Sequence, residues 1–486
     1  DWSGRSVRSE PPSDRLDLYE FSLAPWHSLE LLTPRPFGHP FPVNQRISKL
    51  IPGEGRMWTP SIYSGLVLGI ALLCRLLQPR TYFSDPWVGI AITSLLLCFG
   101  HFGLVWVFQQ IPGVLAEYGS ATGGPFWVLC EWLPGYTSFR YPVKWLPMLA
   151  IATSMVTAQW VSSRPTKVER SVLTALAILF LLGASAAQWA GFHLDSFRGF
   201  LSIVERVDEY WGPLDVRGGL MMARNSFLGS LAILSLLACL RMGVLEQKIP
   251  YLARWSGGFL VVLIAVDCVA SASRLLPPVN LESELRFAHQ ASPPSIAADR
   301  TLRTQAGLWP EAWKKTHSTD RVLEVAVSER LAWFGRWHLA DRRAVFNSMV
   351  SIESRDYADF WNATRQWLSG RDRDSQESYW DSVRQWLSID AVSHVDASRT
   401  MGADGHSLVV VVRVLTEPVQ KFRVWTDWKE TTSMFALVSA LGRSGEVPLP
   451  HVAMKLPARR EIESPIERPL LKRMVNGVIR VSAAVP

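Results

Sequence analysis

The sequence predicts a membrane α-helical bundle of about six spans, followed by an extracytoplasmic α+β domain. The chain of 486 residues is 48% hydrophobic. Its long apolar runs are concentrated between residues 61 and 271, whereas residues 279–486 have the composition of an ordinary globular domain. Many of the 22 tryptophans lie at the ends of the apolar runs, as in the aromatic belts at membrane surfaces. These are Trp58, Trp87, Trp145, Trp189 and Trp255.

Three domains are expected from this division. Residues 1–60 are predicted to be an extracytoplasmic loop segment, 61–278 the transmembrane helical domain, and 279–486 the extracytoplasmic α+β domain. The first segment is polar, but the apolar side chains of Trp26, Leu29, Leu31 and Leu32 suit either an interfacial or a surface helix. The chain begins with Asp1 rather than Met and ends just after a strand-like run, which indicates a fragment of a longer protein.

A membrane span needs about 20 mainly apolar residues, with about 17 as the usual lower limit. Six runs are candidates, at residues 61–77, 87–108, 145–161, 171–189, 226–240 and 255–271. The second and fourth meet the limit most clearly, and the fifth is short, with Arg224 at its edge. Buried helices of a soluble protein are the alternative, but so many apolar runs with so few charges argue against it.

Orientation follows from the lysines and arginines of the short loops. Those after the first, third and fifth runs are basic and are expected in the cytoplasm. Their cations are Arg75 and Arg80, then Arg164, Lys167 and Arg170, then Arg241, Lys248 and Arg254. The protein is therefore predicted to be a multi-pass protein of the bacterial cytoplasmic (inner) membrane, with its C-terminal domain outside. The external loop 192–225 carries an apolar stripe from Phe197 to Trp211, typical of an interfacial helix or of packing on the bundle.

The stretch Phe139–Trp145 joins a glycine-rich loop to the third apolar run. Pro142 fits the first turn of a helix and moves Tyr141 out of the α region, so a helix is expected to begin here. Arg140 and Lys144 would then lie beside the free N–H groups of its N-terminus, where a phosphate can bind. The alternative is that both side chains extend to lipid headgroups, and charge alone does not decide between them.

Two polar side chains fall inside predicted spans. Asp267 lies deep in the sixth, and a carboxylate there needs a partner or a wet cavity. His101 is flanked by Gly100 and Gly103 in the second, where glycines allow close helix contact. Both are predicted to have structural roles. The alternative for Asp267 is a functional role, as a carboxylate that carries a proton or an ion.

The remaining composition excludes several kinds of site. The five cysteines form no CxxC pair, so neither a disulfide framework nor a metal site is predicted. They are Cys74, Cys98, Cys130, Cys239 and Cys268. The net charge of +7 suits an anionic membrane surface, and because no basic cluster with interleaved aromatics is present, nucleic acid is not expected as a partner.

The C-terminal part contains a short repeat. Trp361-Asn-Ala-Thr-Arg-Gln-Trp-Leu-Ser recurs nineteen residues later as Trp380-Asp-Ser-Val-Arg-Gln-Trp-Leu-Ser. The two copies predict a helical hairpin whose tryptophans and leucines share one core. Strands are expected after it because β-branched residues dominate. The expected strands are residues 407–415, 421–425, 435–441 and 477–484.

The chain resembles the bacterial YfhO-like multi-pass membrane proteins, which look like glycosyltransferases of the GT-C type. The resemblance rests above all on Leu133-Pro-Gly-Tyr-Thr-Ser-Phe-Arg-Tyr-Pro-Val-Lys144, with support from Trp58-Thr-Pro-Ser-Ile-Tyr-Ser-Gly and Ala265-Val-Asp267. It implies transfer of a sugar from a polyprenyl-phosphate donor to a cell-envelope acceptor outside the cytoplasm. Arg140, Tyr141 and Lys144 would bind the lipid phosphate as its charge grows.

The resemblance also implies a catalytic acidic residue in a first external loop that this chain lacks, so the catalytic residue stays unassigned. Glu117 and Glu131 are the carboxylates of the Arg140 loop and are expected to be ordinary solvated residues. No cofactor is predicted, although a divalent metal is left open. The alternatives to an enzyme are a membrane transporter or flippase, and a non-catalytic anchor with an external partner-binding domain.

Overall fold

The structure is a computed structural model that describes the chain in separate stretches. These are residues 18–51, 53, 59–78, 85–197, 211–242, 256–273, 300–303, 316–319, 321–331, 339, 344–346, 355–387, 389, 391–400, 408–414, 429–430, 433–443, 451–452, 470–473 and 479–482. The chain forms two compact units, the first of Asp1–Arg355 with Ile389–Pro418, the second of Asp356–Ser388 with Val419–Pro486. The division expected at residue 278 falls outside the described residues and stays a prediction.

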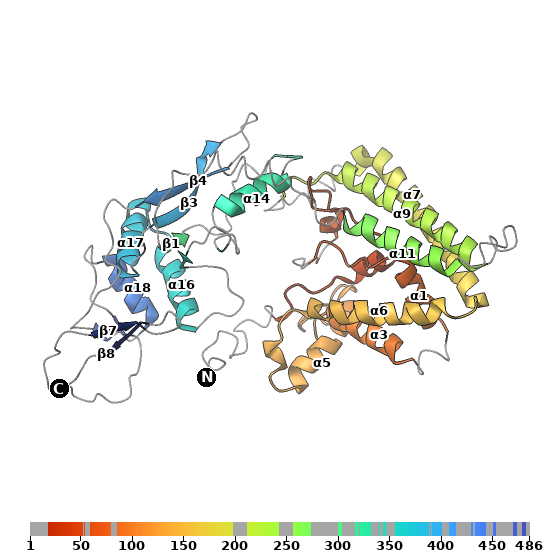
Figure 1. Cartoon of the computed structure of the whole chain (residues 1–486), viewed down its shortest axis with the longest axis horizontal. Helices are drawn as coiled ribbons and strands as arrows, with labels where there is room; N and C mark the ends of the chain where they lie inside the picture. Colours follow the sequence, from red (N-terminus) through yellow and green to blue (C-terminus); the bar gives the residue numbers. More distant parts are fainter. Residues whose placement is uncertain are drawn as a thin grey trace. The chain divides into compact units, whose positions relative to one another are not determined.

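The described residues are mostly helical (Figure 1). In the first unit the helices are η4 (Pro25–Leu31), η5 (Ile47–Leu50), α1 (Leu66–Leu76), α3 (Pro86–Cys98), α4 (Leu104–Gln109), α5 (Pro125–Trp132), η6 (Tyr136–Ser138), η7 (Pro142–Trp145), α6 (Leu146–Val161), α7 (Lys167–Phe192), η8 (Leu194–Phe197), α9 (Val216–Arg241), α11 (Ser256–Ala272) and α14 (Arg321–Leu331). Helices α16 (Arg355–Leu368), α17 (Arg373–Trp386) and α18 (Met434–Arg443) follow.

Two described helices, α7 and α9, are long and apolar enough to cross a membrane. Each has 26 residues, which corresponds to about 39 Å. Helix α7 contains the fourth predicted span. The expectation of a short fifth span is wrong, because α9 begins at Val216, where the Asp215 carboxylate accepts the N–H of Gly218 at 2.9 Å. Arg224 therefore lies within the helix, and its guanidinium bonds the side-chain oxygen of Gln188 on α7.

The other predicted spans coincide with shorter helices, since α1, α6 and α11 have 11, 16 and 17 residues. The second predicted span is wrong as a single helix. Helix α3 ends at Cys98 after 13 residues, and the six-residue α4 begins only at Leu104. The chain turns at Gly100, whose φ is 42° and where a Cβ atom would lie 2.2 Å from Pro142 Cγ. A side chain at this turn would thus collide with the stretch that precedes α6.

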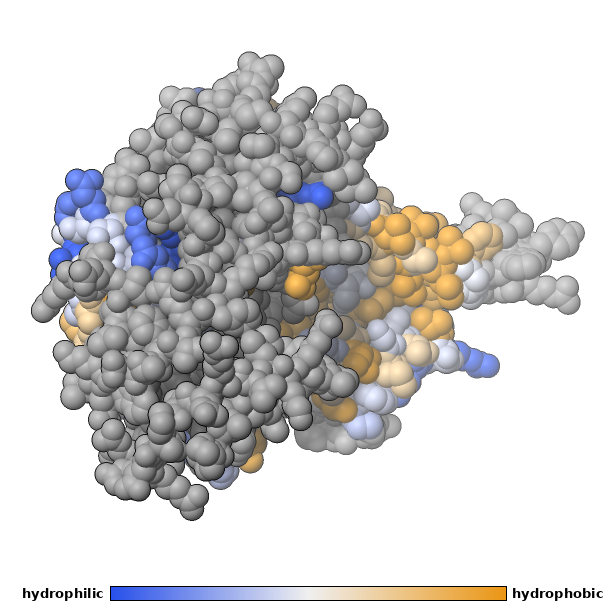
Figure 2. Space-filling model, turned by 60° about the vertical axis from the view of Figure 1, so that its left-hand side comes forward, coloured by the Kyte–Doolittle hydropathy of each residue, from blue (hydrophilic) through white to orange (hydrophobic). Residues whose placement is uncertain are grey.

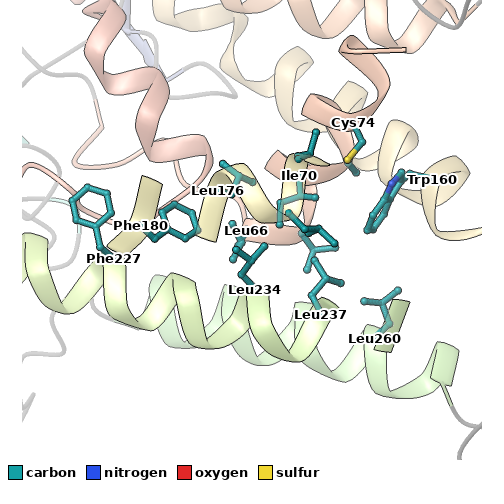
Figure 3. Close-up of a cluster of buried hydrophobic side chains, with 14 of the residues drawn as sticks. Leu66, Ile70, Cys74, Trp160, Leu176, Phe180, Phe227, Leu234, Leu237 and Leu260 are labelled. Atoms are coloured by element: carbon teal, nitrogen blue, oxygen red, sulfur yellow. The ribbon is translucent and has the colours of Figure 1, made fainter. Parts of the chain in front are cut away.

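Helix α1 lies at the centre of the bundle (Figure 3). One face of α1 packs with α7, α9, α11 and the indole of Trp160, while Leu72 faces α3 and α6. The labelled core side chains are Leu66, Ile70, Cys74, Trp160, Leu176, Phe180, Phe227, Leu234, Leu237 and Leu260. Between α7 and α9, Gly183 brings the backbones together, because a Cβ there would lie 2.9 Å from the Phe227 ring.

The segment around η4 is part of this bundle, so neither an interfacial nor a surface helix is correct for it. The Leu31 carbonyl oxygen would lie 2.1 Å from a Cβ atom on Gly69 of α1. Glu30, which is 4% exposed, accepts the backbone N–H of Ile62 at 3.0 Å. Contacts to α1 and to Ile62 just before it therefore bury the segment. The periodicity of Trp26–Leu32 does not predict these contacts, because they involve distant residues.

A single guanidinium ties three helix ends together. Arg241, at the end of α9, bonds both carboxylate oxygens of Glu169 on α7, at 3.0 and 3.2 Å. It also donates to the carbonyl oxygens of Trp160, Val161 and Ser163 at and just after the C-terminus of α6. Its Cζ lies 4.3 Å from the centre of the Trp160 ring. Arg241, expected as a loop cation, therefore joins the ends of three helices as a half-buried side chain.

In the second unit, helices α16 and α17 confirm the predicted hairpin. The two copies of the repeat make equivalent contacts: Phe360 stacks on Trp386, and Tyr379, nineteen residues after Phe360, stacks on Trp367. Trp361 faces its own counterpart Trp380, with ring centroids 6.0 Å apart. The repeat therefore folds with pseudo-two-fold symmetry, in which each copy completes the core of the other.

Helix α18 replaces a predicted strand, so the expectation for residues 435–441 is wrong. Leu437, Val438 and Leu441 are buried at helical spacing, and a Cβ on Gly442 would lie 2.0 Å from the Trp367 ring. The helix begins beside Ser433, whose hydroxyl accepts the N–H of Ala436. Packing against the hairpin selects a helix where β propensity alone favours a strand.

The described strands pair into small sheets. Strands β1 (Arg300–Arg303), β2 (Ala344–Val345), β3 (Ala391–Thr400) and β4 (Leu408–Val414) are ordered β2-β1-β3-β4, with β1 parallel to both neighbours and β3 antiparallel to β4. Strands β5 (Lys429–Glu430) and β6 (His451–Val452) pair in parallel, and β7 (Leu470–Arg473) and β8 (Ile479–Ser482) antiparallel. Strands β4 and β8 confirm two predictions, while residues 421–425 and 198–210 lie outside the described residues.

Candidate functional site

The stretch Phe139–Trp145 begins with a backbone under strain. Tyr141 has φ 73° and ψ 95°, a conformation that costs a non-glycine residue about 1–3 kcal/mol. Its N–H bonds the Leu18 carbonyl oxygen at 3.3 Å, and Pro142 behind it is buried. A helical turn does begin at Pro142, as predicted, but it is a 3₁₀ turn that becomes α-helix at Leu146. Strain of this kind is typical of functional segments.

The two cations of this stretch have different surroundings. The Lys144 ammonium lies 5.1 Å from the ring centres of both Phe139 and Tyr141, where the aromatic faces attract it. The Nε atom of Arg140 is buried and has no hydrogen-bond partner within the described part of the chain. A buried donor without a partner is rare and suits an anion that binds from outside the chain.

The side chains next to this stretch behave as the sequence indicates, or support it. Glu117 and Glu131 are both exposed. The Trp145 indole N–H donates to the Tyr136 hydroxyl at 2.9 Å, and burial raises the pKa of Tyr136. The expectation that His101 lies inside a span is wrong, because it follows the end of α3, where its backbone N–H donates to the Ser22 hydroxyl at 2.8 Å. These contacts brace the turn that carries Arg140 and Lys144.

Asp267 on α11 meets the beginning of α1. Its two carboxylate oxygens each lie 2.8 Å from the Tyr63 hydroxyl, and its Oδ2 accepts the N–H of Leu66 at 2.8 Å. A carboxylate at this position complements the positive end of the helix dipole. Gly65 permits the approach, because a Cβ there would lie 3.1 Å from Cys268 Sγ. The sequence analysis missed Tyr63, which no local pattern connects to a residue two hundred positions away.

Asp267 also borders a cavity of about 700 Å³ between residues 34–45, α9 and α11. Its apolar wall is formed by Met221, Met222, Ile233, Leu263 and Val266, and its polar lining includes Arg35, Gln45, Asp215, Arg217, Asn225, Ser226 and Ser230. Arg35 is 8% exposed, whereas Arg217 in the first turn of α9 is exposed. The cavity thus combines apolar walls with two arginines.

A glycine pair lets residues 44–47 reach the first turn of α9. A Cβ atom on Gly219 would lie 2.5 Å from the Gln45 carbonyl oxygen, so only glycine permits this contact. The Gln45 side-chain amide then donates to Asp215 Oδ2 at 2.9 Å, while the Asn44 amide donates to the Gly212 carbonyl at 3.0 Å. Asp215 is therefore engaged as a helix cap.

His39 lies in the same segment as Arg35. Burial lowers the pKa of His39, and the nearby Arg35 cation adds to this effect, although the Phe41 backbone and Glu30 oppose it. The His39 Nε2 atom is buried without a hydrogen-bond partner within the described ranges. The lowered pKa disfavours the charged imidazole, whereas the Arg35 guanidinium keeps its positive charge.

Comparison with known protein families, with curated proteins and with solved structures finds no match for this chain. The site is therefore argued from its own geometry. Among the described residues, no group of three or more His, Cys, Asp or Glu side chains is placed to hold a metal ion.

The cavity escaped the sequence analysis because its residues come from segments far apart in the chain. Asp215 followed by Gly218-Gly219 was the available signal: a helix cap, then a glycine pair that marks close backbone contact. Arg140, Tyr141 and Lys144 do not line the cavity. The structure thus presents two cationic groups, one in the Phe139–Trp145 stretch and one in the α9–α11 cavity.

Proposed function

We propose that this chain belongs to a GT-C-type glycosyltransferase of the bacterial cytoplasmic membrane. It transfers a sugar from a polyprenyl-phosphate donor to a cell-envelope acceptor on the outer side, with six membrane spans and an extracytoplasmic C-terminal α+β domain. The observation that carries the proposal is the α9–α11 cavity. Its volume of about 700 Å³ has an apolar wall that suits part of a lipid chain, and its lining includes Arg35 and Arg217, which suit a phosphate, as well as the carboxylates Asp215 and Asp267.

Two further observations support a membrane location. Helices α7 and α9 have the length and composition of membrane spans. Their large apolar side chains are also widely exposed: Ile178, Leu181, Leu182, Leu228 and Leu236 are 45–63% exposed. Figure 2 shows apolar side chains gathered on the helical part of the chain. A surface of this kind is costly in water and favourable in hydrocarbon.

The cavity also agrees with the expected orientation. The charge pattern predicts that the N-terminal segment, the loop before α9 and the end of α11 all face outward. Residues 34–45, the first turn of α9 and the last turns of α11 border the cavity. A phosphate bound there would be on the side where the acceptor is expected.

In the proposed reaction an acceptor hydroxyl attacks the anomeric carbon of the donor sugar, and its proton passes to a carboxylate. A carbon–oxygen bond to the acceptor forms as the bond to the lipid phosphate breaks. The leaving phosphate gains charge, which fixed cations stabilise. Arg35 and Arg217 are proposed for this role, and Arg140 with Lys144 is the alternative position for the same phosphate.

The test is sugar transfer by the full-length protein in lipid nanodiscs, with a labelled polyprenyl-phosphate sugar as donor. Arg217→Ala should lower turnover by about 10²–10³-fold, the usual effect of removing one preorganised donor. Arg164→Ala is the matched control, because this exposed arginine precedes α7 at the opposite end of the bundle. Unchanged transfer by Arg217→Ala would remove the cavity from the reaction. Donor binding without any transfer by the wild type would favour a flippase or an anchor.

A further inference from the structure

The segment from Leu104 to Tyr118 turns its apolar side chains outward. Helix α4 buries none of its residues. The exposed large side chains of the segment are Leu104, Val107, Phe108, Ile111, Val114, Leu115 and Tyr118, each 36–59% exposed. A segment this apolar and this exposed needs a covering medium or partner.

Several polar groups of the same segment, including both glutamine side chains, are hydrogen-bonded within it or to Ser120. The Gln109 side-chain amide donates to the carbonyl oxygens of Leu115 and Tyr118, at 2.9 and 2.8 Å. Its own oxygen accepts the Ser120 hydroxyl at 2.8 Å. The Gln110 amide donates to the Trp106 carbonyl at 3.0 Å, and the backbone N–H groups of Ile111 and other turn residues bond within the segment. In water these carbonyl groups could bond solvent, but an apolar medium offers no partners. The Gln109 side chain, which bonds the Leu115 and Tyr118 carbonyls and Ser120, is called the Gln109 staple below.

The base of the segment is fixed to its neighbours. The N–H groups of Gly103 and Trp106 bond the Ser120 carbonyl at 3.1 and 3.3 Å, and Val105 bonds the Thr122 carbonyl at 3.1 Å. Gly103 is required there, since a Cβ would lie 2.3 Å from the Ala121 carbonyl oxygen. The outward apolar side chains therefore extend from a backbone that hydrogen bonds fix to residues 120–122.

The charge of the region indicates which medium covers it. Residues 81–139 contain no lysine or arginine, and Glu117 is the one ionised side chain of residues 104–118. The segment follows the C-terminal end of α3, where Cys98 packs with Val143 just before α6. The exposed apolar side chains of α6, Met148, Ile151 and Met155, begin at this end of the helix. The segment thus lies at the level where the outward surface of the bundle becomes apolar.

We infer that residues 104–118 form an apolar finger that inserts into the outer leaflet of the bilayer, at the boundary between headgroups and acyl chains. The occupant of its outward face is lipid. Apolar surface drives the insertion, and the Gln109 staple removes the cost of carrying carbonyl groups into that layer. Glu117, near the end of the segment, stays at the headgroups. The inference depends on the membrane location and is independent of sugar transfer.

The test places an environment-sensitive fluorescent amino acid at Ile111 of the full-length protein in lipid nanodiscs. Lipids carry bromine either near the ester end or near the methyl end of the acyl chain. Emission at 111 should be blue-shifted and quenched more by bromine near the ester end. The matched control is the same probe at Ser378, an exposed position on α17, where neither lipid should quench.

Absence of quenching at 111 in a protein that unfolds at the wild-type temperature would overturn the inference. If the probe at 111 lowers the unfolding temperature, the same quenching measurement is made with the probe at Val107, and its result decides whether the segment contacts lipid. A photo-crosslinking amino acid at Ile111 identifies the occupant: capture of lipid supports the inference, while capture of another polypeptide or a second copy of the chain overturns it. Absence of sugar transfer by the wild-type protein, together with the expected quenching at 111, would count against the proposed function alone.

Discussion

The Phe139–Trp145 stretch and the α9–α11 cavity both offer positive charge, but they are built in opposite ways. In the stretch, the Lys144 ammonium is held by rings three and five residues before it, Tyr141 and Phe139. In the cavity, Arg35 and Arg217 are joined only because three distant segments of the chain meet. The stretch is a local structure, whereas the cavity is a product of the tertiary fold.

This difference shows that two neighbouring cations in a sequence do not by themselves indicate an anion-binding site. A cation–aromatic contact within a few residues already gives Lys144 a partner, so its position does not by itself require a ligand. The Nε atom of Arg140, by contrast, is buried without a hydrogen-bond partner among the described residues, which suits an external anion. The cavity arginines line a volume large enough for part of a lipid chain.

The sharpest comparison is a charge-preserving substitution at each site. Arg217→Lys should lower sugar transfer by at least about tenfold, because lysine loses the bidentate contact to phosphate. Arg140→Lys should leave transfer near the wild-type rate if the phosphate binds in the cavity as proposed. The rates are measured at saturating donor, with thermal unfolding in parallel. The reverse result, a slow Arg140→Lys and a normal Arg217→Lys, would move the phosphate to the Phe139–Trp145 stretch.

The next comparison uses two glycines on α9, of which Gly219 contacts residues 44–47 and Gly229 lines the cavity. Gly219→Ala should destabilise the protein by about 1–3 kcal/mol, because its Cβ would overlap the Gln45 carbonyl. Gly229→Ala has nothing within 4 Å of its Cβ and should be neutral or stabilising by up to about 1 kcal/mol through helix propensity. Unfolding in detergent checks both. Equal effects would mean that residues 44–47 do not touch α9.

A smaller effect is expected where Asp267 joins the cavity to α1. Asp267→Asn should cost about 1–2 kcal/mol of stability, since the amide weakens the contacts to Tyr63 and Leu66 without removing them. Sugar transfer should be kept, as for a structural capping group. Tyr63→Phe is the matched variant and should be destabilising to a similar degree. Full loss of transfer by a stably folded Asp267→Asn protein would instead give the carboxylate a part in the reaction.

The smallest effect concerns pH. Because burial lowers the pKa of His39, the unfolded chain binds the proton more readily than the folded one. Stability should therefore fall as the pH drops below about 6.5, the usual pKa of histidine, by at most about 1.4 kcal/mol per pH unit. Unfolding temperatures between about pH 8 and pH 5 measure this slope. His39→Gln should flatten it, and an unchanged slope would assign the proton to another group.

The sequence predicted elements well where local pattern and final structure agree. The apolar run of α7 and the repeated Trp–Leu pattern of α16 and α17 specify helices, and packing in the structure keeps them as helices. Prediction failed where a distant contact overrides the local pattern. Pro142 packs against Gly100 where the second span breaks, and the Trp367 ring packs against Gly442 at the end of α18. Glycine is the common sign, but a sequence does not say which backbone or ring will approach it.

By itself, the sequence determined the long apolar run of α7, the helical turn that begins at Pro142 and the hairpin repeat, because hydropathy, proline and periodicity act over a few residues. Only the tertiary structure decided that Asp267 caps α1 and that Arg35 and Arg217 share a cavity. Those contacts join residues about two hundred positions apart. They depend on how whole helices pack, which is set by shape complementarity over many side chains at once.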